Sequence, residues 1–434
     1  MRLPNYKGAV SYIAGKDDPS MSLFSGLLGS LFDRTSSWIS SQKQTEGDIT
    51  ALCERLLSTT GEASGQSLAH DILDKYATLS DDEKKAFFLY LRHNLDLDVS
   101  ASIAALSSYK ASPDSKTYSA VHAAIEPRRL VLFTRLNAED GATERLVEMR
   151  ADILAHLSEM PELGPVAFDL QQLFISWFNR GFLVLRPISW QSPAHILEKI
   201  IAYEAVHSID SWDALRLRLA PADRRCFAFF HPAMPDEPLI FVEVALTDHV
   251  PHSIQEILAD DRPVLNDDAF TTATFYSISN CQKGLAGISF GNSLIKTVVR
   301  ELSADMSAIK QFVTLSPIPR LAKWVASEGI DADGLADAEI APTLTAYYLC
   351  HAKRTDGQPA DPVARFHLNN GALIHAVHQH ADTAPLAQKQ SFGMMVNYLY
   401  QVPDIAQNHE KYAHGTVVAA AAIHSLAKKY NATD

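Results

Sequence analysis

One stretch, residues 274–319, constrains the fold more than any other part of the chain. The β-branched and aromatic residues of Phe275–Ser279 predict a strand, and a glycine-rich turn follows it. Apolar residues then recur at helical spacing between Leu294 and Leu302, so a helix is expected there. A second strand is predicted over Gln311–Leu315. The stretch therefore predicts a strand, a turn, a helix and a strand as one unit of an α/β sheet.

The turn of this unit contains Gly284, Gly287 and Gly291. Free N–H groups at a helix N-terminus, together with the positive end of the helix dipole, favour an anion at such a place. The same pattern also fits an ordinary strand–turn–helix unit that binds nothing. From spacing alone, phosphate binding is one of two open interpretations.

The part of the chain before this sheet has a different hydrophobic period. From about residue 45 to residue 178, apolar residues recur with helical spacing and no strand pattern is found. Ser80 and Glu83 form a capping-box sequence ahead of one such helix. The pattern changes near Asn179, and Phe182–Pro187 is the first convincing strand. We therefore predict an all-α helical bundle over 1–178 and an α/β domain over 179–434.

Composition limits the function classes. The chain has 434 residues and a net charge of −13, which argues against general nucleic-acid binding. No apolar run approaches the roughly 20 residues of a membrane span, and Met1–Ser20 lacks a signal-peptide core and is expected to be loosely ordered. The four cysteines are widely spaced, without a zinc pattern, which suggests a reducing, cytoplasmic setting.

The glycine turn is similar to the coenzyme A pyrophosphate loop of GNAT-type acyltransferases, which has the form Gln/Arg-x-x-Gly-x-Gly/Ala. Here the corresponding residues are Ala286-Gly287-Ile288-Ser289-Phe290-Gly291, which keep only the final glycine. A closer resemblance is to the malonyl-CoA decarboxylase family. It is carried by six strings in order: Cys226–Thr247, Phe275–Ser279, Gly284–Leu302, Leu315–Pro319, Ala364–Ala372 and Met395–Tyr400.

This resemblance implies a helical N-terminal domain that helps to form a homo-oligomer, either dimer or tetramer, and a GNAT-like catalytic domain. It also implies conversion of malonyl-CoA to acetyl-CoA and carbon dioxide. The family's catalytic serine and histidine correspond to Ser316 and His367, and further active-site positions correspond to Ser277 and Tyr400. The implied malonyl-CoA-binding loop comprises Ala286, Gly287, Ile288, Ser289, Phe290, Gly291 and Asn292.

The chemistry fits these residue types. Decarboxylation of a malonyl thioester needs an oriented carboxylate, donors to the developing enolate oxygen and a proton source. The thioester carbonyl accepts the electron pair, so neither cofactor nor metal is expected. A serine can orient the carboxylate, and a histidine with a pKa near 6.5 can deliver the proton. His375, His378 and His380 do not have zinc-site spacing and are interpreted as histidines at the surface or on a helix that contacts a partner.

Structural interpretations stay open for each residue. Ser316 could end a strand before Pro317, and His367 and Tyr400 could belong to the core. Ser277 could lie on one face of a strand. Two other functions also stay open: an acyltransferase that passes an acyl group to an amine, and a non-catalytic coenzyme A sensor. Neither nucleic acid nor membrane is an expected partner.

Overall fold

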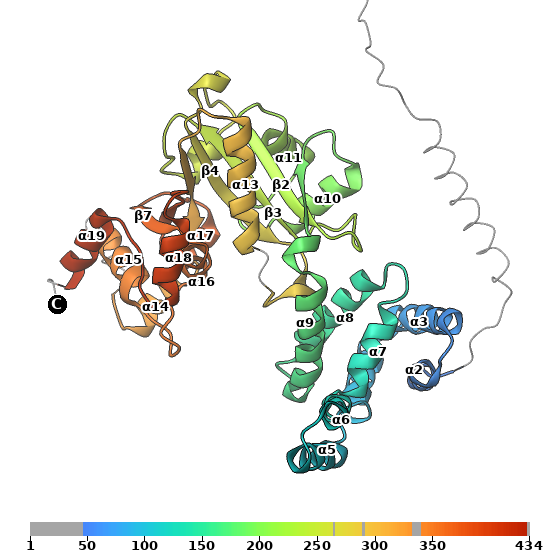
Figure 1. Ribbon diagram of the computed structural model, residues 1–434. Coiled ribbons are helices and arrows are strands. Elements are labelled where there is room, and N and C mark those ends of the chain that lie inside the picture. The colour runs from blue at the N-terminus through green and yellow to red at the C-terminus, as the bar shows by residue number, and fades with distance from the viewer. Residues whose placement is uncertain (1–46, 264, 289–290, 332–339, 432–434) are drawn as a thin grey trace, which may run out of the picture.

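The computed structural model describes residues 47–263, 265–288, 291–331 and 340–431 (Figure 1). Met1–Ser20, expected to be loosely ordered, lies outside the described residues. So do Ser289 and Phe290 of the expected coenzyme A loop.

The first part of the described chain is entirely helical, as predicted. Its helices are α2 (Ile49–Ser58), α3 (Glu62–Ala77), α4 (Asp81–His93), α5 (Val99–Ala111), α6 (Ser115–Ile125), α7 (Arg128–Leu136), α8 (Ala142–His156), the short η1 (Pro161–Leu163) and α9 (Gly164–Trp177). We call α2–α9 the helical region. The capping box is present, because Ser80 accepts from the Glu83 amide and the Glu83 carboxylate accepts from the Ser80 amide.

The second part of the chain is built on one mixed sheet. Its strands are β1 (Val184–Ile188), β2 (Arg224–Phe230), β3 (Ile240–Thr247), β4 (Thr272–Asn280), β5 (Gln311–Thr314), β6 (Ser316–Pro317), β7 (Leu373–His378) and β8 (Met395–Leu399). They lie in the order β1-β2-β3-β4-β5-β8-β6, and β7 pairs with β8. β2 and β3 pair in an antiparallel hairpin, whereas β4 and β5 run parallel. The expected strand at Phe182 begins later, at Val184, because Arg180–Phe182 forms a 3-10 turn.

Helices cover both faces of this sheet. The helices of the second part are α10 (Ala194–Tyr203), α11 (Trp212–Leu219), α12 (Ile254–Leu258), α13 (Gly291–Asp305), α14 (Leu321–Ser327), α15 (Ile340–His351), α16 (Pro362–Asn369), α17 (Pro385–Ser391), α18 (Ile405–Ala413) and α19 (Ala421–Asn431). In Figure 1, α13 crosses the front of β2–β4, and α10 and α11 lie toward the opposite side. Separate apolar clusters support this arrangement, because Leu294 and Val298 of α13 pack with Phe275, whereas Ile200 of α10 packs with Phe241.

The predicted strand–turn–helix–strand unit is therefore β4, the loop with η4 (Lys283–Leu285), α13 and β5. The fold class is confirmed as a helical N-terminal region followed by a mixed sheet domain with flanking helices. Among the described helices, none combines the length and the apolar character that crossing a bilayer requires.

The parallel pair β4–β5 separates toward its far end. Pairing runs from Thr272 with Gln311 to Phe275 with Thr314, and the Leu315 amide still donates to the Phe275 carbonyl at 3.0 Å. Beyond that point β6 pairs with β8 instead. The gap between β4 and β6 is where the candidate site lies.

Candidate functional site

A cavity of about 320 Å³ lies where β4 and β6 separate. Its walls come from β4, β6 and α16, with Val206 from the segment after α10. They are mostly apolar, and the polar side chains that line the cavity include Ser316 and His367. An apolar cavity with a few convergent polar groups is typical of a small-molecule site. The last lining residue on β4 is Asn280, just before the glycine loop, so this end of the cavity lies next to that loop.

Three predicted residues are joined by hydrogen bonds at this cavity. Ser316 Oγ lies 3.2 Å from His367 Nε2, and His367 Nδ1 lies 2.8 Å from the Tyr400 hydroxyl. Ser316 Oγ donates to Thr314 Oγ1 at 2.8 Å. If the Tyr400 hydroxyl donates to Nδ1, then Nε2 carries the imidazole proton toward Ser316. With this assignment, each bond from Tyr400 to Thr314 has one donor and one acceptor.

His367 is buried, with only 2% of its surface exposed. Burial lowers the pKa of its imidazole from 6.5 to about 3. The ring is therefore neutral at pH 7 in the free protein, which differs from the sequence-based expectation of a pKa near 6.5. The Tyr398 ring stacks on the imidazole, with centroids 4.5 Å apart and planes at 22°. This contact leaves the ring little freedom to turn.

The position of His367 follows from local sequence. Asp361 caps α16 by accepting from the amides of Val363 and Ala364, and Pro362 occupies the first turn. His367 then falls on the same face as Ala364 and Leu368, and this face is buried. The helix thus directs an imidazole inward among apolar side chains.

Two residues that sequence reasoning missed support Ser316. Thr314 Oγ1 accepts from Ser316 and also from the Tyr398 amide at 3.1 Å. Asn397 donates to the Thr314 carbonyl at 2.7 Å and is fully buried. The sequence did offer a signal for Asn397, because it is a polar amide inside the apolar string Met395–Tyr400 and a buried amide needs hydrogen-bond partners.

Ser277 is not brought together with the other three predicted residues. Its hydroxyl donates to the Glu204 carboxylate at 2.7 and 2.8 Å and does not line the cavity. Ser279 donates to the same carboxylate at 3.3 Å. A register shift where β3 pairs with β4, between Glu243 and Val244, accompanies this arrangement. The role of Ser277 thus stays a prediction.

The expected coenzyme A loop is described in part. Ala286, Gly287 and Ile288 follow η4, and Gly287 has a φ of +81°, a conformation that favours glycine. Gly291 and Asn292 form the first residues of α13, and the structure describes only their backbone.

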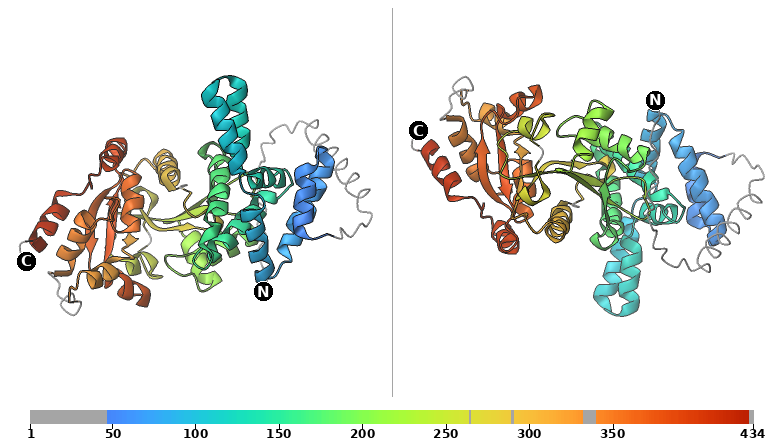
Figure 2. Two further views of the ribbon diagram at one scale, coloured as in Figure 1. Left: turned by 90° about the horizontal axis from the view of Figure 1, so that it is seen from below. Right: turned by 90° about the horizontal axis from the view of Figure 1, so that it is seen from above.

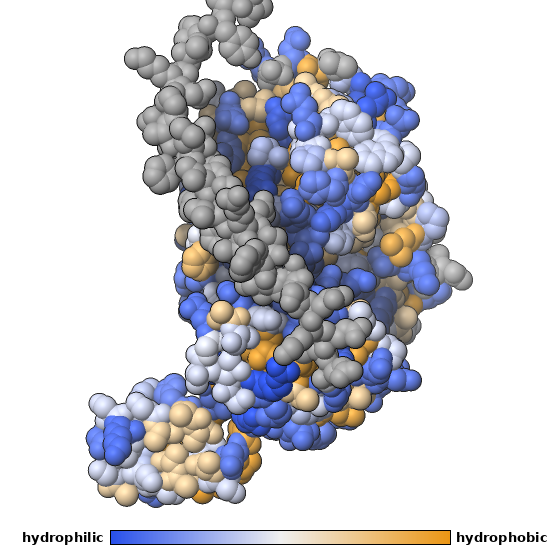
Figure 3. Space-filling view, turned by 90° about the vertical axis from the view of Figure 1, so that its right-hand side faces the viewer, coloured by the Kyte–Doolittle hydropathy of each residue, from blue (hydrophilic) through white to orange (hydrophobic). Residues whose placement is uncertain are grey.

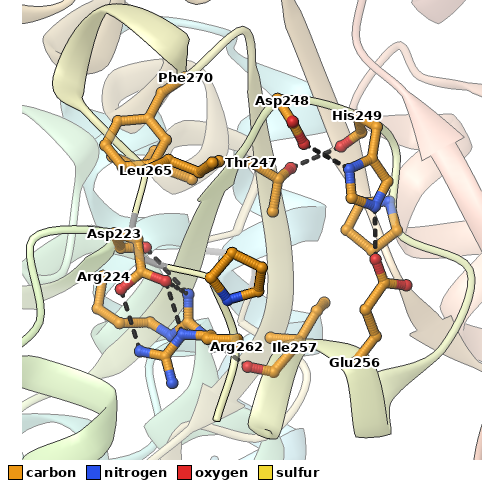
Figure 4. Close-up of a pocket in the computed structure, with 13 residues that line it drawn as sticks. Asp223, Arg224, Thr247, Asp248, His249, Glu256, Ile257, Arg262, Leu265 and Phe270 are labelled. Atoms are coloured by element: carbon orange, nitrogen blue, oxygen red, sulfur yellow. Dashed lines mark hydrogen bonds and ion pairs between the residues drawn. The ribbon is translucent and has the colours of Figure 1, made fainter. Parts of the chain in front are cut away.

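A second pocket, of about 230 Å³, lies beside the ends of β2 and β3 that are remote from Ser316 (Figure 4). Its charged groups are already paired with one another. Asp223 accepts from Arg224 and Arg262, and His249 lies between Asp248 and Glu256. The hydrogen bond to Asp248 is the main reason why the pKa of His249 is raised. These mutually satisfied ion pairs are typical of a structural network.

The histidines after α16 do not form a metal centre in the part of the chain that the structure describes, where no group of three or more ligand side chains is found. His378 instead bonds to the Asn397 side chain, and its Nδ1 lies 3.3 Å from His252 Nδ1.

Comparison with protein families accounts for most of the chain. Residues 181–341 and 331–434 match the model of the malonyl-CoA decarboxylase C-terminal domain, and residues 98–178 match that of the N-terminal domain. The chain belongs to the malonyl-CoA decarboxylase family. The curated mitochondrial malonyl-CoA decarboxylase of Anser anser anser is 36% identical over 338 residues, which span 66% of this chain and 67% of that relative.

Solved structures of malonyl-CoA decarboxylases share the fold. That from Rhodopseudomonas palustris is 45% identical, with a TM-score of 0.83, and covers 87% of this chain and 98% of its own. That from Agrobacterium vitis is also 45% identical, with the same TM-score, and covers 88% and 99%. In this member of the malonyl-CoA decarboxylase family, the strings with Ser316 and His367 converge on one cavity, and the string with Tyr400 contacts His367 behind it.

Proposed function

We propose that this chain decarboxylates malonyl-CoA to acetyl-CoA and carbon dioxide in the cavity between β4 and β6. One observation carries the proposal within the family: Ser316 and His367 line the cavity, and a continuous buried hydrogen-bonded chain joins them to Tyr400. Buried polar chains of this kind position reacting groups with little reorganisation.

The reaction breaks one C–C bond and consumes one proton. The carboxylate leaves as carbon dioxide, and the electron pair of the broken bond moves into the thioester carbonyl to form an enolate. The enolate carbon then takes a proton and becomes the methyl group of acetyl-CoA. We assign the orientation of the carboxylate to Ser316, whose hydroxyl hydrogen can turn from Thr314 toward the substrate. The thioester itself is the electron sink, so no bound cofactor is proposed.

His367 is assigned the proton transfer. Its burial keeps the imidazole neutral in the free protein, with a pKa of about 3. A malonyl carboxylate or an enolate beside the ring favours the imidazolium and raises this pKa again. With the substrate bound, the imidazole takes up one proton from solvent at Nδ1, where the Tyr400 hydroxyl then accepts its hydrogen bond, and passes the Nε2 proton to the enolate carbon. Tyr400 positions the ring through Nδ1.

The loop from Ala286 to Asn292 is assigned the coenzyme A pyrophosphate. It joins the end of β4 to the N-terminus of α13, where main-chain N–H groups and the helix dipole favour phosphate. Binding the coenzyme there holds the acyl group in the cavity, which converts binding energy into orientation.

We also propose a homo-oligomer that forms through the helical region. Helices α5 and α6 pack on each other, and they extend from the body (Figure 2). Val99, Ile103 and Leu106 form one stripe on α5, and each is at least half exposed. In Figure 3, the lobe at the lower left carries weakly apolar side chains beside hydrophilic ones. Such a stripe is typical of a protein–protein contact.

The setting proposed for the protein is a reducing compartment such as the cytoplasm. All four cysteines are free and buried, so the fold uses no disulfide.

The test is to incubate the purified protein with malonyl-CoA alone. We expect acetyl-CoA and carbon dioxide in equal amounts, with no acceptor present. An acyltransferase would instead need an amine acceptor and would release free coenzyme A. The absence of turnover without an acceptor would overturn the proposal.

A further inference from the structure

The helical region contacts the proposed coenzyme A loop directly. The short η4 packs closely against α8. A Cβ atom on Gly284 would lie 1.8 Å from the main-chain oxygen of Val147, so only glycine permits this approach. Gly284 is therefore explained by the contact with α8 and not by phosphate binding.

Two side chains of the helical region hold the carbonyl groups of this loop. Arg150, on α8, donates through Nη1 to the carbonyls of Gly284 and Ala286, the latter at 3.0 Å. Gln171, on α9, donates to the Gly287 carbonyl at 3.3 Å. Three carbonyl groups of the loop region, those of Gly284, Ala286 and Gly287, are thus hydrogen-bonded to the helical region. These carbonyls point toward α8 and α9, so the negative ends of their dipoles face the helical region. The opposite side of the loop is therefore less negative.

The charge of Arg150 has no carboxylate partner. Arg150 is buried, its Nε donates to the Ala167 carbonyl at 3.1 Å, and it forms no ion pair with any described residue. Burial lowers the pKa of its guanidinium, but an arginine stays charged at neutral pH. Arg129 of the same region provides the contrast, because it is buried between Asp96 and Asp169. An uncompensated buried charge is costly unless an opposite charge arrives with a ligand.

Two further cations lie near the same end of α13. Lys296 lies on the second turn of α13, and Arg180 comes from the 3-10 turn after α9. Desolvation, and secondarily the Arg180 charge, lower the pKa of Lys296. Within the described residues, neither side chain forms an ion pair. A local surplus of positive charge in a chain of net charge −13 indicates an anionic ligand.

We infer that the helical region is part of the coenzyme A site: Arg150 and Gln171 position the loop, and the charge of Arg150 complements the coenzyme phosphates. Arg150 is a positioning residue here and does not touch the reacting atoms. This inference rests on the proposed function, because it takes the loop to bind coenzyme A.

The test compares malonyl-CoA with malonyl-pantetheine, which keeps the reacting group but lacks the pyrophosphate and the nucleotide. Arg150→Met keeps the length of the side chain and removes its charge. We expect the KM for malonyl-CoA to rise about tenfold, with kcat/KM for malonyl-pantetheine within about twofold of the wild type. Arg150→Lys should keep part of the affinity, because lysine supplies the charge but not the forked donor geometry of the guanidinium.

The matched control is Arg135→Met. Arg135 also donates to main-chain carbonyls, those of Leu56, Leu57 and Thr59. These carbonyls belong to the helical region itself and are far from the loop in the sequence. This variant should leave the KM and kcat for both substrates unchanged. If Arg150→Met lowers kcat/KM equally for both substrates, Arg150 has only a structural role and the inference fails. Unchanged kinetics with both substrates would also overturn it.

Calorimetric titration with coenzyme A alone separates this inference from the proposed function. If the wild type binds coenzyme A but does not turn over malonyl-CoA, the proposed function fails, and the affinity of Arg150→Met still tests the inference. About tenfold weaker binding in that variant supports it, and unchanged binding refutes it.

Discussion

His367 lies 51 residues after Ser316 and 33 residues before Tyr400, yet the three side chains form one hydrogen-bonded chain. Each of these residues has an ordinary structural use when it is considered alone. What distinguishes them is that their partners are one another, inside a cavity that is otherwise mostly apolar. Asn397 and Thr314 extend the same polar chain into the sheet.

Replacing His367 tests the proton transfer. His367→Asn should lower kcat by about 10²-fold or more, with a smaller change in KM, because general acid–base groups contribute on this scale. His380→Asn is the control, since His380 is exposed and its φ of +55° also suits asparagine. Steady-state kinetics of both variants decide the matter, and a wild-type kcat in His367→Asn would remove His367 from the mechanism.

The buried imidazole also predicts how stability depends on pH. The pKa of His367 is about 3 when folded and about 6.5 when unfolded, so the unfolded chain binds the extra proton between these values. The stability due to the neutral ring is complete above pH 6.5 and is lost on acidification by about 1.4 kcal/mol per pH unit.

Urea unfolding at pH 7 and pH 5 measures this loss. Between these two values, His367→Asn should lose about 2 kcal/mol less of the free energy of unfolding than the wild type. Equal losses would mean that the imidazole is not held neutral.

Replacing Ser316 tests the orientation of the carboxylate. Ser316→Ala should lower kcat by about tenfold or more, because a hydrogen bond to a charged group contributes about 1.5–3 kcal/mol. The Thr314 hydroxyl keeps its bond to the Tyr398 amide, so we expect the fold to be retained. Circular dichroism and kinetics together check this, and unchanged kinetics would leave Ser316 as a strand end.

Among the glycines whose surroundings the structure describes, Gly284 makes the closest approach to another element, at the contact between α8 and the η4 loop. Gly284 has no room for a side chain, because the obstacle is the main chain of α8 and not a flexible side chain. The loop and the helical region therefore depend on each other for their positions.

Gly284→Ala should separate these two elements. We expect the free energy of unfolding to fall by about 1–3 kcal/mol and the KM for malonyl-CoA to rise. Gly164→Ala is the control, because an added Cβ there meets nothing within 4 Å. Urea unfolding and kinetics distinguish the outcomes. If both variants behave alike, the close approach of α8 is not what the glycine provides.

For the whole molecule, α5 and α6 form the part of the described chain that buries least. Of α5 only Ser102 is buried, and of α6 no residue is buried. Two helices with exposed apolar side chains gain little from packing only on each other.

Charges on this stripe should disrupt an oligomer. In Ile103→Glu/Leu106→Glu we expect a smaller particle mass by light scattering after size exclusion, with unchanged helical content. The matched control is Ser107→Glu/Ser108→Glu, which adds the same charge beside the stripe on α5. A wild-type oligomer in Ile103→Glu/Leu106→Glu would exclude this surface as the interface.

The sequence by itself determined the local elements. Periodicity predicted the helical region and the β4–loop–α13–β5 unit, because burial of one face imposes the spacing of apolar residues. The family strings indicated Ser316, His367 and Tyr400. These are properties of short segments and of motifs, which the order of residues carries directly.

Which polar groups meet depends on how distant segments pack together. Ser277 bonds to Glu204 away from the cavity, and His367 becomes neutral because distant segments remove its water. Spacing left phosphate binding as one of two interpretations of the β4–α13 loop, and Arg150 and Gln171 of the helical region hold this loop by its carbonyl groups. Such contacts join residues more than 100 positions apart and follow from how the regions pack, which no local pattern specifies.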